Sequence, residues 1–172
     1  MRKRRCCSIE IRYLLPSDDL RKISDVYEQS WKYAYKNIIP QEYLDSIPVG
    51  HWADRICRDG WNNLVAIENE TIIGTSCLSK SRFAQYGDHG EIISIYLLPE
   101  YMGKGYGKLL LDRVIDELRK LGHRDILLWV LAYNHRARRF YERYGFVPNG
   151  EKLQDNIGGR DLTEVMYVYQ LH

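Results

Sequence analysis

Residues 91–107, EIISIYLLPEYMGKGYG, carry the clearest structural signal in this chain. The first part, EIISIYLL, is rich in isoleucine, leucine and tyrosine, which is typical of a β-strand, and Pro99 ends it. Gly103, Gly105 and Gly107 then mark a turn before an amphipathic pattern begins. The segment therefore predicts a strand, a glycine-rich turn and a helix in direct succession.

The residues that follow this turn extend the pattern. Residues 108–122, KLLLDRVIDELRKLG, place apolar side chains three and four positions apart, as one buried helical face requires. Residues 126–131, ILLWVL, are apolar without a break, which suits a strand covered on both faces. Residues 134–146, NHRARRFYERYGF, predict a short aromatic helix that Asn134 caps and Gly145 ends.

The rest of the chain supplies the remaining elements. The expected elements are a strand at residues 9–15, a helix at 20–34, a second helix around Trp52, a hairpin of strands at 64–68 and 72–78, and a closing strand at 162–171. No repeat, linker or low-complexity tract divides the chain. Residues 1–172 are therefore expected to form one domain.

Composition narrows the class of protein. A net charge of +2 is too small to indicate a nucleic-acid partner, and the basic cluster at residues 2–5 is typical of a solvated chain end. No apolar run approaches the roughly 20 residues of a membrane span. The 4 cysteines lack the spaced CxxC pairs of a zinc site. We therefore expect a cytoplasmic protein with no metal, no nucleic-acid partner and no membrane partner.

The glycine turn is a candidate anion site. Glycines leave the backbone N–H groups at the positive end of a helix uncovered, and Lys104 and Lys108 add positive charge, which suits a pyrophosphate. A Walker loop is excluded because Met102 and Leu109 occupy its first glycine and its hydroxyl position. A dinucleotide fingerprint is excluded because it needs a glycine at Lys108. The alternative is that the glycines only permit a tight turn.

The turn and the aromatic helix together resemble the GNAT acetyltransferase superfamily. Its cofactor loop runs Gln or Arg, two residues, Gly, one residue, then Gly or Ala, and Gly105 and Gly107 match it. Met102 stands in the first position, which removes a polar side chain and predicts weaker cofactor binding. The second signature, Asn, two residues, Ala, then Phe-Tyr-Glu and Gly-Phe, is matched by Asn134, Ala137, Phe140, Tyr141, Glu142, Gly145 and Phe146.

This resemblance implies an α/β GNAT fold: a single domain with a mixed, mostly antiparallel, centrally splayed sheet of about six or seven strands, flanked by about four helices. It implies acetyl-CoA as the co-substrate, with its pyrophosphate on the glycine turn and its pantetheine arm along residues 91–98. At about 3.3 Å per residue this strand spans about 23 Å, which lets the thioester reach its middle. The implied cofactor-binding residues are Leu97, Leu98, Met102, Gly103, Lys104, Gly105, Tyr106, Gly107, Lys108, Asn134, Ala137 and Tyr141.

Acetyl transfer needs a group that takes a proton from the amine and a group that protonates the leaving thiolate. Tyr141 matches the general acid of the family, and a phenol with a pKa near 10 is a suitable donor. Glu91 stands where some members carry a general-base glutamate. His89 is the alternative base. Packing in the core is the alternative role for Tyr141, and a surface position at the strand's start is the alternative for Glu91.

The acceptor site is the part of the predicted active site that the sequence defines least. Trp31, Tyr35, Tyr86 and His89 are the candidate acceptor contacts, although the spacing of Trp31 and Tyr35 also fits an ordinary core stripe. A polyamine-like acceptor is one candidate because dispersed acids could attract a cation: Glu28, Glu42, Asp45 and Asp88. The predicted function is direct acetyl transfer from acetyl-CoA to a primary amine of a small molecule. The alternatives are acetylation of a protein N-terminus or lysine, and a non-catalytic acyl-CoA sensor.

The same resemblance bears on assembly. Many members of the superfamily form dimers, so a homodimer is compatible with it, but no feature of this sequence fixes the oligomeric state.

Overall fold

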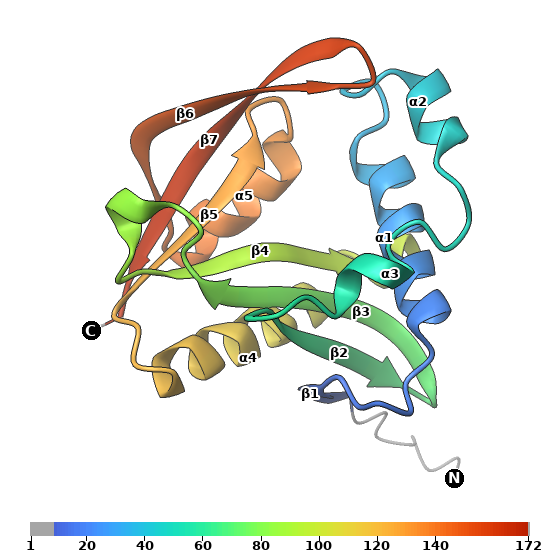
Figure 1. Cartoon of the computed structure of the whole chain (residues 1–172), viewed down its shortest axis with the longest axis horizontal. Helices are drawn as coiled ribbons and strands as arrows, with labels where there is room; N and C mark the ends of the chain where they lie inside the picture. The colour runs from blue at the N-terminus through green and yellow to red at the C-terminus, as the bar shows by residue number, and fades with distance from the viewer. Residues whose placement is uncertain (1–8, 172) are drawn as a thin grey trace, which may run out of the picture.

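The computed structural model describes residues 9–171 of the chain as a mixed seven-stranded sheet with helices on both faces (Figure 1). The strands lie in the order β1-β2-β3-β4-β5-β7-β6, and only β4 and β5 run parallel to each other. The strands are β1 Glu10–Tyr13, β2 Asn62–Glu68, β3 Thr71–Lys80, β4 Gly90–Leu97, β5 Asp125–Leu131, β6 Val147–Ile157 and β7 Arg160–Gln170. The helices are α1 Leu20–Ala34, α2 Gln41–Ser46, α3 Ala53–Ile56, α4 Tyr106–Lys120 and α5 His135–Tyr144, with 3-10 turns η1 Ala84–Tyr86 and η2 Pro99–Tyr101.

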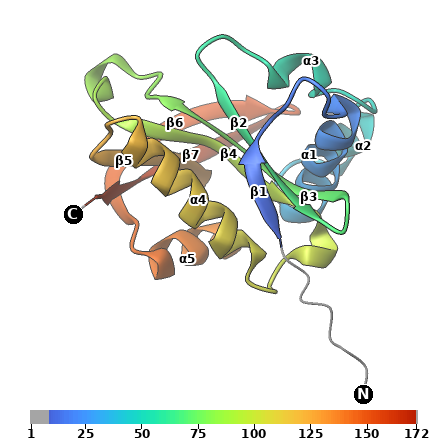
Figure 2. The same cartoon turned by 90° about the horizontal axis from the view of Figure 1, so that it is seen from below.

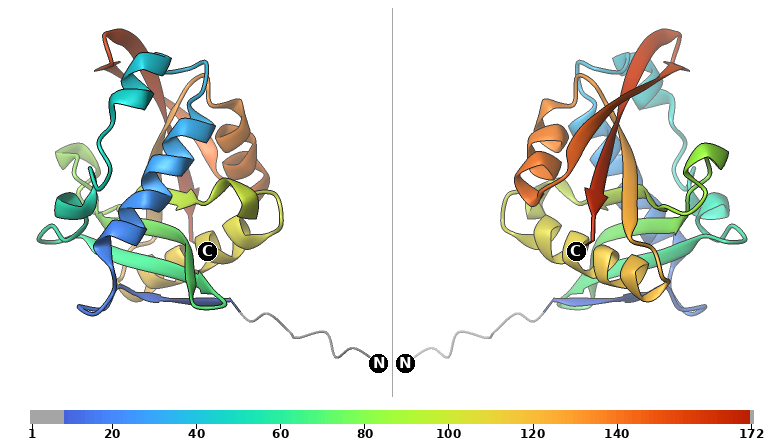
Figure 3. Two further views of the ribbon diagram at one scale, coloured as in Figure 1. Left: turned by 90° about the vertical axis from the view of Figure 1, so that its right-hand side faces the viewer. Right: turned by 90° about the vertical axis from the view of Figure 1, so that its left-hand side faces the viewer.

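Two helices cover opposite faces of the centre of the sheet. Helix α4 packs its apolar stripe under β3 and β4, where Leu110, Leu111 and Val114 are fully buried (Figure 2). Helix α1 covers the other face of the same strands with Ile23 and Val26 (Figure 3). Each such leucine or isoleucine contributes about 1.5–3 kcal/mol through the apolar surface removed from water.

The sheet opens in its middle. Strands β4 and β5 pair at only three positions, from Gly90 opposite Ile126 to Ile92 opposite Leu128. Beyond these residues the two strands diverge, as Figure 1 shows, while β5 continues to pair with β7 along its whole length. The second half of β4 therefore has an edge that no strand covers.

The expected fold class is confirmed: the sheet is mixed, mostly antiparallel and centrally splayed. Five α-helices occur within residues 9–171, where about four were expected. The first strand is shorter than expected, and β6 was not expected at all. The basic cluster at residues 2–5 lies outside the described residues. No helix in the described part of the chain has the length and apolar character needed to cross a bilayer.

Candidate active site

A cavity of about 610 Å³ occupies the opening between β4 and β5. Helices α1 and α5, the glycine turn and the strands β6 and β7 supply the rest of its lining. The glycine turn follows the carboxyl end of β4, whereas Glu91 lies at the start of that strand and also lines the cavity. The cavity thus runs along β4 from a predicted anion site to a predicted base.

The glycine turn is built for backbone contacts. Gly103 and Gly105 have φ angles of +77° and +93°, which an L side chain rarely adopts, and no atom lies within 4 Å of where their Cβ atoms would be. Helix α4 starts immediately afterwards without a side-chain cap. Within the described residues, the N–H groups of Gly103, Lys104, Gly105 and Gly107 have no acceptor. The turn therefore offers several unused donors at a helix N-terminus, the arrangement that binds phosphate oxygens.

At the two ends of this turn, fewer groups are available to bind an anion than the sequence predicted. The Met102 N–H is donated to the Pro99 carbonyl at 3.2 Å, and the Lys108 N–H to the Gly105 carbonyl at 3.1 Å. The Lys108 ammonium forms an ion pair with Asp112 at 2.8 Å. Its charge near the turn is therefore partly neutralised, so that of the two lysines only Lys104 carries an unpaired charge there.

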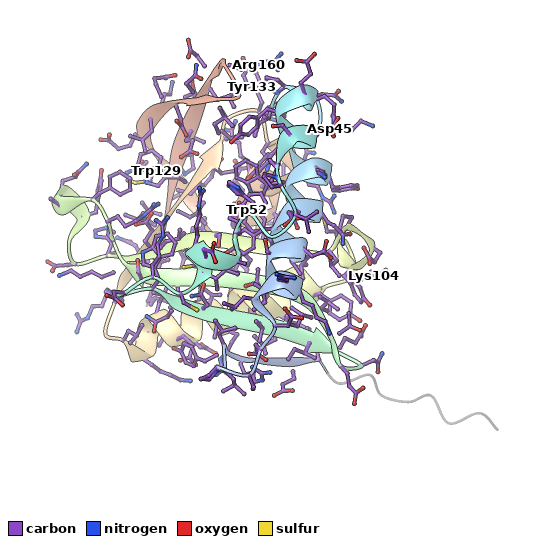
Figure 4. All side chains as sticks on the ribbon, turned by 45° about the vertical axis from the view of Figure 1, so that its right-hand side comes forward. Asp45, Trp52, Lys104, Trp129, Tyr133 and Arg160 are labelled. Carbon is purple, nitrogen blue, oxygen red and sulfur yellow. The ribbon has the colours of Figure 1, made fainter. Side chains whose placement is uncertain are left out.

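Lys104 extends on the outside of the molecule, beyond the end of β4 (Figure 4). Its ammonium nitrogen lies 5.7 Å from the centre of the Tyr101 ring. Because the side chain is exposed and flexible, it can follow a phosphate at the rim of the turn.

The expected backbone contact between Leu98 and the cofactor is wrong. The Leu98 N–H is already donated to Ile73 of β3 at 2.8 Å, so it cannot serve a ligand in the cavity. Because successive residues of a strand point their backbone groups to opposite edges, the groups of Leu97 face the open side. The Leu97 carbonyl accepts a hydrogen bond from the Ser30 hydroxyl, which anchors α1 at this edge. Leu97, rather than Leu98, offers the backbone contact.

Helix α5 brings its predicted residues to the cavity together. Asn134 caps the helix by accepting the Ala137 N–H at 3.1 Å, and both residues line the cavity with Tyr141. Burial raises the pKa of Tyr141, whose side chain is 8% exposed, and no described residue hydrogen-bonds its hydroxyl. Tyr141 is therefore a protonated phenol whose O–H is free to be donated to a bound molecule.

Glu91 is buried at the opposite end of β4, not at the surface. One carboxylate oxygen accepts from the Arg82 guanidinium at 2.6 and 3.1 Å, and the other accepts the Arg82 backbone N–H at 2.9 Å. Both oxygens are thus engaged by one residue. A molecule in the cavity that bonds to these oxygens would therefore compete with Arg82 for them.

Aromatic side chains of α1 form one wall of the cavity. Trp31 packs edge-on against Tyr35 with ring centres 5.0 Å apart, and its indole N–H is donated to the Tyr96 hydroxyl at 3.0 Å. Burial raises the pKa of both tyrosines, which keeps them neutral. Trp31 and Tyr35 line the cavity, and their role as acceptor contacts stays a prediction.

Other predicted acceptor contacts lie elsewhere. Tyr86 and His89 pack on each other with ring centres 5.3 Å apart and do not line the cavity. The acids expected to attract a cation are also absent from the lining: Glu28, Glu42, Asp45 and Asp88. Glu28 instead accepts bonds from Ser24 and from the backbone of Gly50, inside the protein.

The cavity contains polar residues that sequence analysis did not identify. Arg82, Asp155 and Glu164 line it near Glu91, and so does Trp129 of β5, which Figure 4 labels. The Trp129 indole N–H is buried and has no acceptor among the described residues. The two-residue period of a strand puts Glu164 on the same face as Leu162 and Met166, but nothing local showed that this face of β7 borders a cavity.

The splayed sheet, the glycine turn before α4 and the capped aromatic helix α5 define an N-acetyltransferase of the GNAT type. Residues 22–146 match the family model described as the acetyltransferase (GNAT) family, and the chain belongs to this family. It is an N-acetyltransferase, as the sequence predicted.

Relatives with a named activity align with most of the chain. The spermidine N(1)-acetyltransferase of Thermoplasma acidophilum is 27% identical over 164 residues, which are 93% of this chain and 98% of the relative. The alanine N-acetyltransferase of ribosomal protein bS18 from Haemophilus influenzae is 36% identical over 112 residues, 62% of this chain and 71% of the relative. The crystal structure of the PaiA N-acetyltransferase from T. acidophilum in complex with coenzyme A superimposes with a TM-score of 0.73 at 27% identity, covering 95% of this chain and 99% of that one.

Proposed function

We propose that this protein transfers the acetyl group of acetyl-CoA to a primary amine of a small molecule. The observation that carries the proposal is the continuity of the site: unused N–H donors at the start of α4 open into the cavity along the uncovered edge of β4. The coenzyme A complex of the PaiA relative and the amine named for the spermidine relative support it.

The chain's own groups suit a pyrophosphate with an extended thioester arm. Gly103, Gly105 and Gly107 would donate backbone N–H groups to the phosphate oxygens, and Lys104 would add its charge at the rim. The Leu97 N–H would hold the arm as a neighbouring strand would. Acetyl-CoA supplies the activated acetyl group on its thioester.

Tyr141 would donate its phenolic proton to the departing sulfur. Its hydroxyl is protonated at neutral pH, lines the cavity and has no competing partner among the described residues. A positioned general acid of this kind contributes about 10²–10⁴-fold to a rate. Asn134 would fix the start of α5 and so the position of Tyr141.

Transfer would be direct, without an acetylated enzyme. The described cysteines, Cys57 and Cys77, do not line the cavity. Glu91 is the base that the resemblance indicates, and both its oxygens accept hydrogen bonds from Arg82.

The test is detection of free thiol from acetyl-CoA in the presence of polyamines, amino acids, aminoglycosides and short peptides, with mass spectrometry of the products. Thiol release that depends on a small amine is the expected result. Release with peptides alone would favour a protein acetyltransferase, the activity named for the bS18 relative. Acetyl-CoA binding without release by any amine would favour a non-catalytic sensor.

A further inference from the structure

Glu164 occupies an unusual position in the sheet. It lies in β7, opposite Leu131 of β5 and Leu153 of β6, and its side chain lines the cavity. On its own strand the neighbours on the same face are Leu162 and Met166, which are 3% and 0% exposed. A carboxylate therefore stands in an apolar stripe at the wall of the acetyl-transfer site.

The Glu164 carboxyl has no bonding partner within residues 9–171. No described residue forms a hydrogen bond or an ion pair with it, in contrast to Glu91, both of whose oxygens are bound by Arg82. The Trp129 indole N–H, one strand away, is likewise buried without an acceptor. Both groups are therefore available to a molecule bound in the cavity.

The charged and titratable groups that face Glu164 come from four elements. They are Asp155 of β6, Glu91 of β4, Arg82 of the loop before β4, and the phenols Tyr35 of α1 and Tyr96 of β4. Burial raises the pKa of Glu164, the charges of Asp155 and Glu91 raise it further, and Arg82 lowers it. Because no described residue occupies its lone pairs, the Glu164 carboxylate is open to accept a proton from a bound ammonium group.

Glu164 and the predicted acid, Tyr141, line the same cavity. Tyr96 also lines this cavity, and its electrostatic interactions reach both Glu164 and Tyr141. The carboxylate is therefore open to an amine bound in the same cavity as the acid.

We propose that Glu164 takes the proton from the ammonium group of the acceptor and that the Glu91–Arg82 pair is a fixed part of the wall; this inference rests on the proposed acetyl transfer. The N–H bond of the ammonium breaks, its electron pair stays on nitrogen, and an O–H bond forms on Glu164, which later releases the proton to water. The neutral amine then forms the N–C bond as the C–S bond breaks. The second proton that leaves nitrogen replaces the one that Tyr141 gives to sulfur.

The test is the pH dependence of kcat/KM for Glu164→Gln, Glu91→Gln and the parent, with the best amine from the thiol assay. Glu164→Gln should lower kcat/KM about 100-fold at pH 7. The deficit should shrink as the pH rises and the free amine becomes abundant, and the affinity for acetyl-CoA should stay within about twofold of the parent. Glu91→Gln should lower kcat/KM less than tenfold and keep the parent's pH profile.

Two further variants separate chemistry from folding. Glu164→Asp keeps the carboxylate and should recover part of the activity. Glu151→Gln makes the same change at an exposed position of β6 outside the cavity and should leave the rate unchanged.

Three results would overturn the inference. If Glu164→Gln keeps the rate and pH profile of the parent, the base role falls and acetyl transfer stands. The same holds if Glu164→Asp is no more active than Glu164→Gln. If the parent itself releases no thiol with any amine, the proposed function falls and this inference with it.

Discussion

Arg82 and Glu91 form an asymmetric ion pair, with the guanidinium Nη2 2.6 Å from Oε1 of the carboxylate. The Arg82 side chain is 46% exposed, whereas the Glu91 side chain is 1% exposed. Because Glu91 is buried and Arg82 is not, nearly all the desolvation cost of the pair falls on the carboxylate, and Arg82 is the group that offsets it. The pair therefore closes the cavity at the start of β4 and holds the loop before that strand.

Removing Arg82 should destabilise the protein because Glu91 would be left without its partner. We expect Arg82→Met to lower the free energy of unfolding by about 1–3 kcal/mol, the cost of an unsatisfied buried acceptor. Urea unfolding at pH 7 measures it. The double variant Arg82→Met/Glu91→Gln should recover part of the loss, since it removes the buried charge. Additive losses in the two single variants would show that the pair is not coupled.

The hydroxyl of Tyr141 should matter for turnover and not for stability. Tyr141→Phe removes a group without a hydrogen bond among the described residues, so the midpoint of thermal unfolding should stay within about 1 °C. We expect kcat to fall about 100-fold while the Kd for acetyl-CoA stays within about twofold. Tyr133→Phe is the control, because Tyr133 is 66% exposed and lies outside the cavity (Figure 4). An unchanged kcat for Tyr141→Phe would remove its role as the acid.

Parts of the site that lie within a few consecutive residues could be predicted from the sequence, whereas parts that distant strands bring together could not. The glycine turn and the α5 cap were predicted because each is contained in a few consecutive residues. Arg82 and Glu164 were missed because they reach the cavity only through pairing between distant strands: Glu164 lies opposite Leu131, and Arg82 binds Glu91 across a loop. The two-residue period places Glu164 on the face of Leu162 and Met166, but no local pattern shows that this face borders a cavity.

The missed strand has a similar physical explanation. β6, Val147–Ile157, pairs only with β7 at the edge of the sheet, and most of its residues are exposed. An edge strand that is open to water on both faces needs no apolar alternation, so its polar sequence resembles a loop. The register shift between Pro148 and Lys152 weakens the strand pattern further.

The backbone shape at Gly105 should control affinity for acetyl-CoA. Gly105 and Gly150 both have φ of +93° and free space around the Cβ position, but only Gly105 lies in the cavity. Alanine at either position should cost about 1–2 kcal/mol of stability, because a left-handed conformation strains an L residue. Only Gly105→Ala should weaken acetyl-CoA binding, by about tenfold in calorimetry. Equal affinities in the two variants would argue against phosphate binding at the turn.

Met102 offers a gain-of-affinity test. Its side chain lines the cavity at the position where the family carries Gln or Arg. Met102→Gln should add one hydrogen bond to bound acetyl-CoA, worth about 1 kcal/mol, which is about a fivefold lower Kd. Leu109→Gln adds the same side chain to an exposed position of α4 outside the cavity and should not change Kd. A Kd for Met102→Gln at or above that of the parent would contradict the expected contact.

The pH dependence of stability should depend on Asp18, at the entrance to α1. Hydrogen bonds from the Arg12 guanidinium at 2.7 and 2.8 Å lower the pKa of the Asp18 carboxyl. A lowered pKa means that this stabilisation is complete above the unfolded value of about 3.9 and is lost as the pH falls through the folded value. Asp18→Asn should therefore lower the free energy of unfolding by about 1–2 kcal/mol at pH 7, and the difference from the parent should shrink below about pH 4.

Glu10→Gln is the control for this prediction. Glu10 also contacts Arg12, at 3.3 Å, but its side chain is 62% exposed, so its loss should cost under about 0.5 kcal/mol. Urea unfolding at several pH values measures both, and an equal effect of the two variants at pH 7 would show that the Arg12–Asp18 geometry adds nothing.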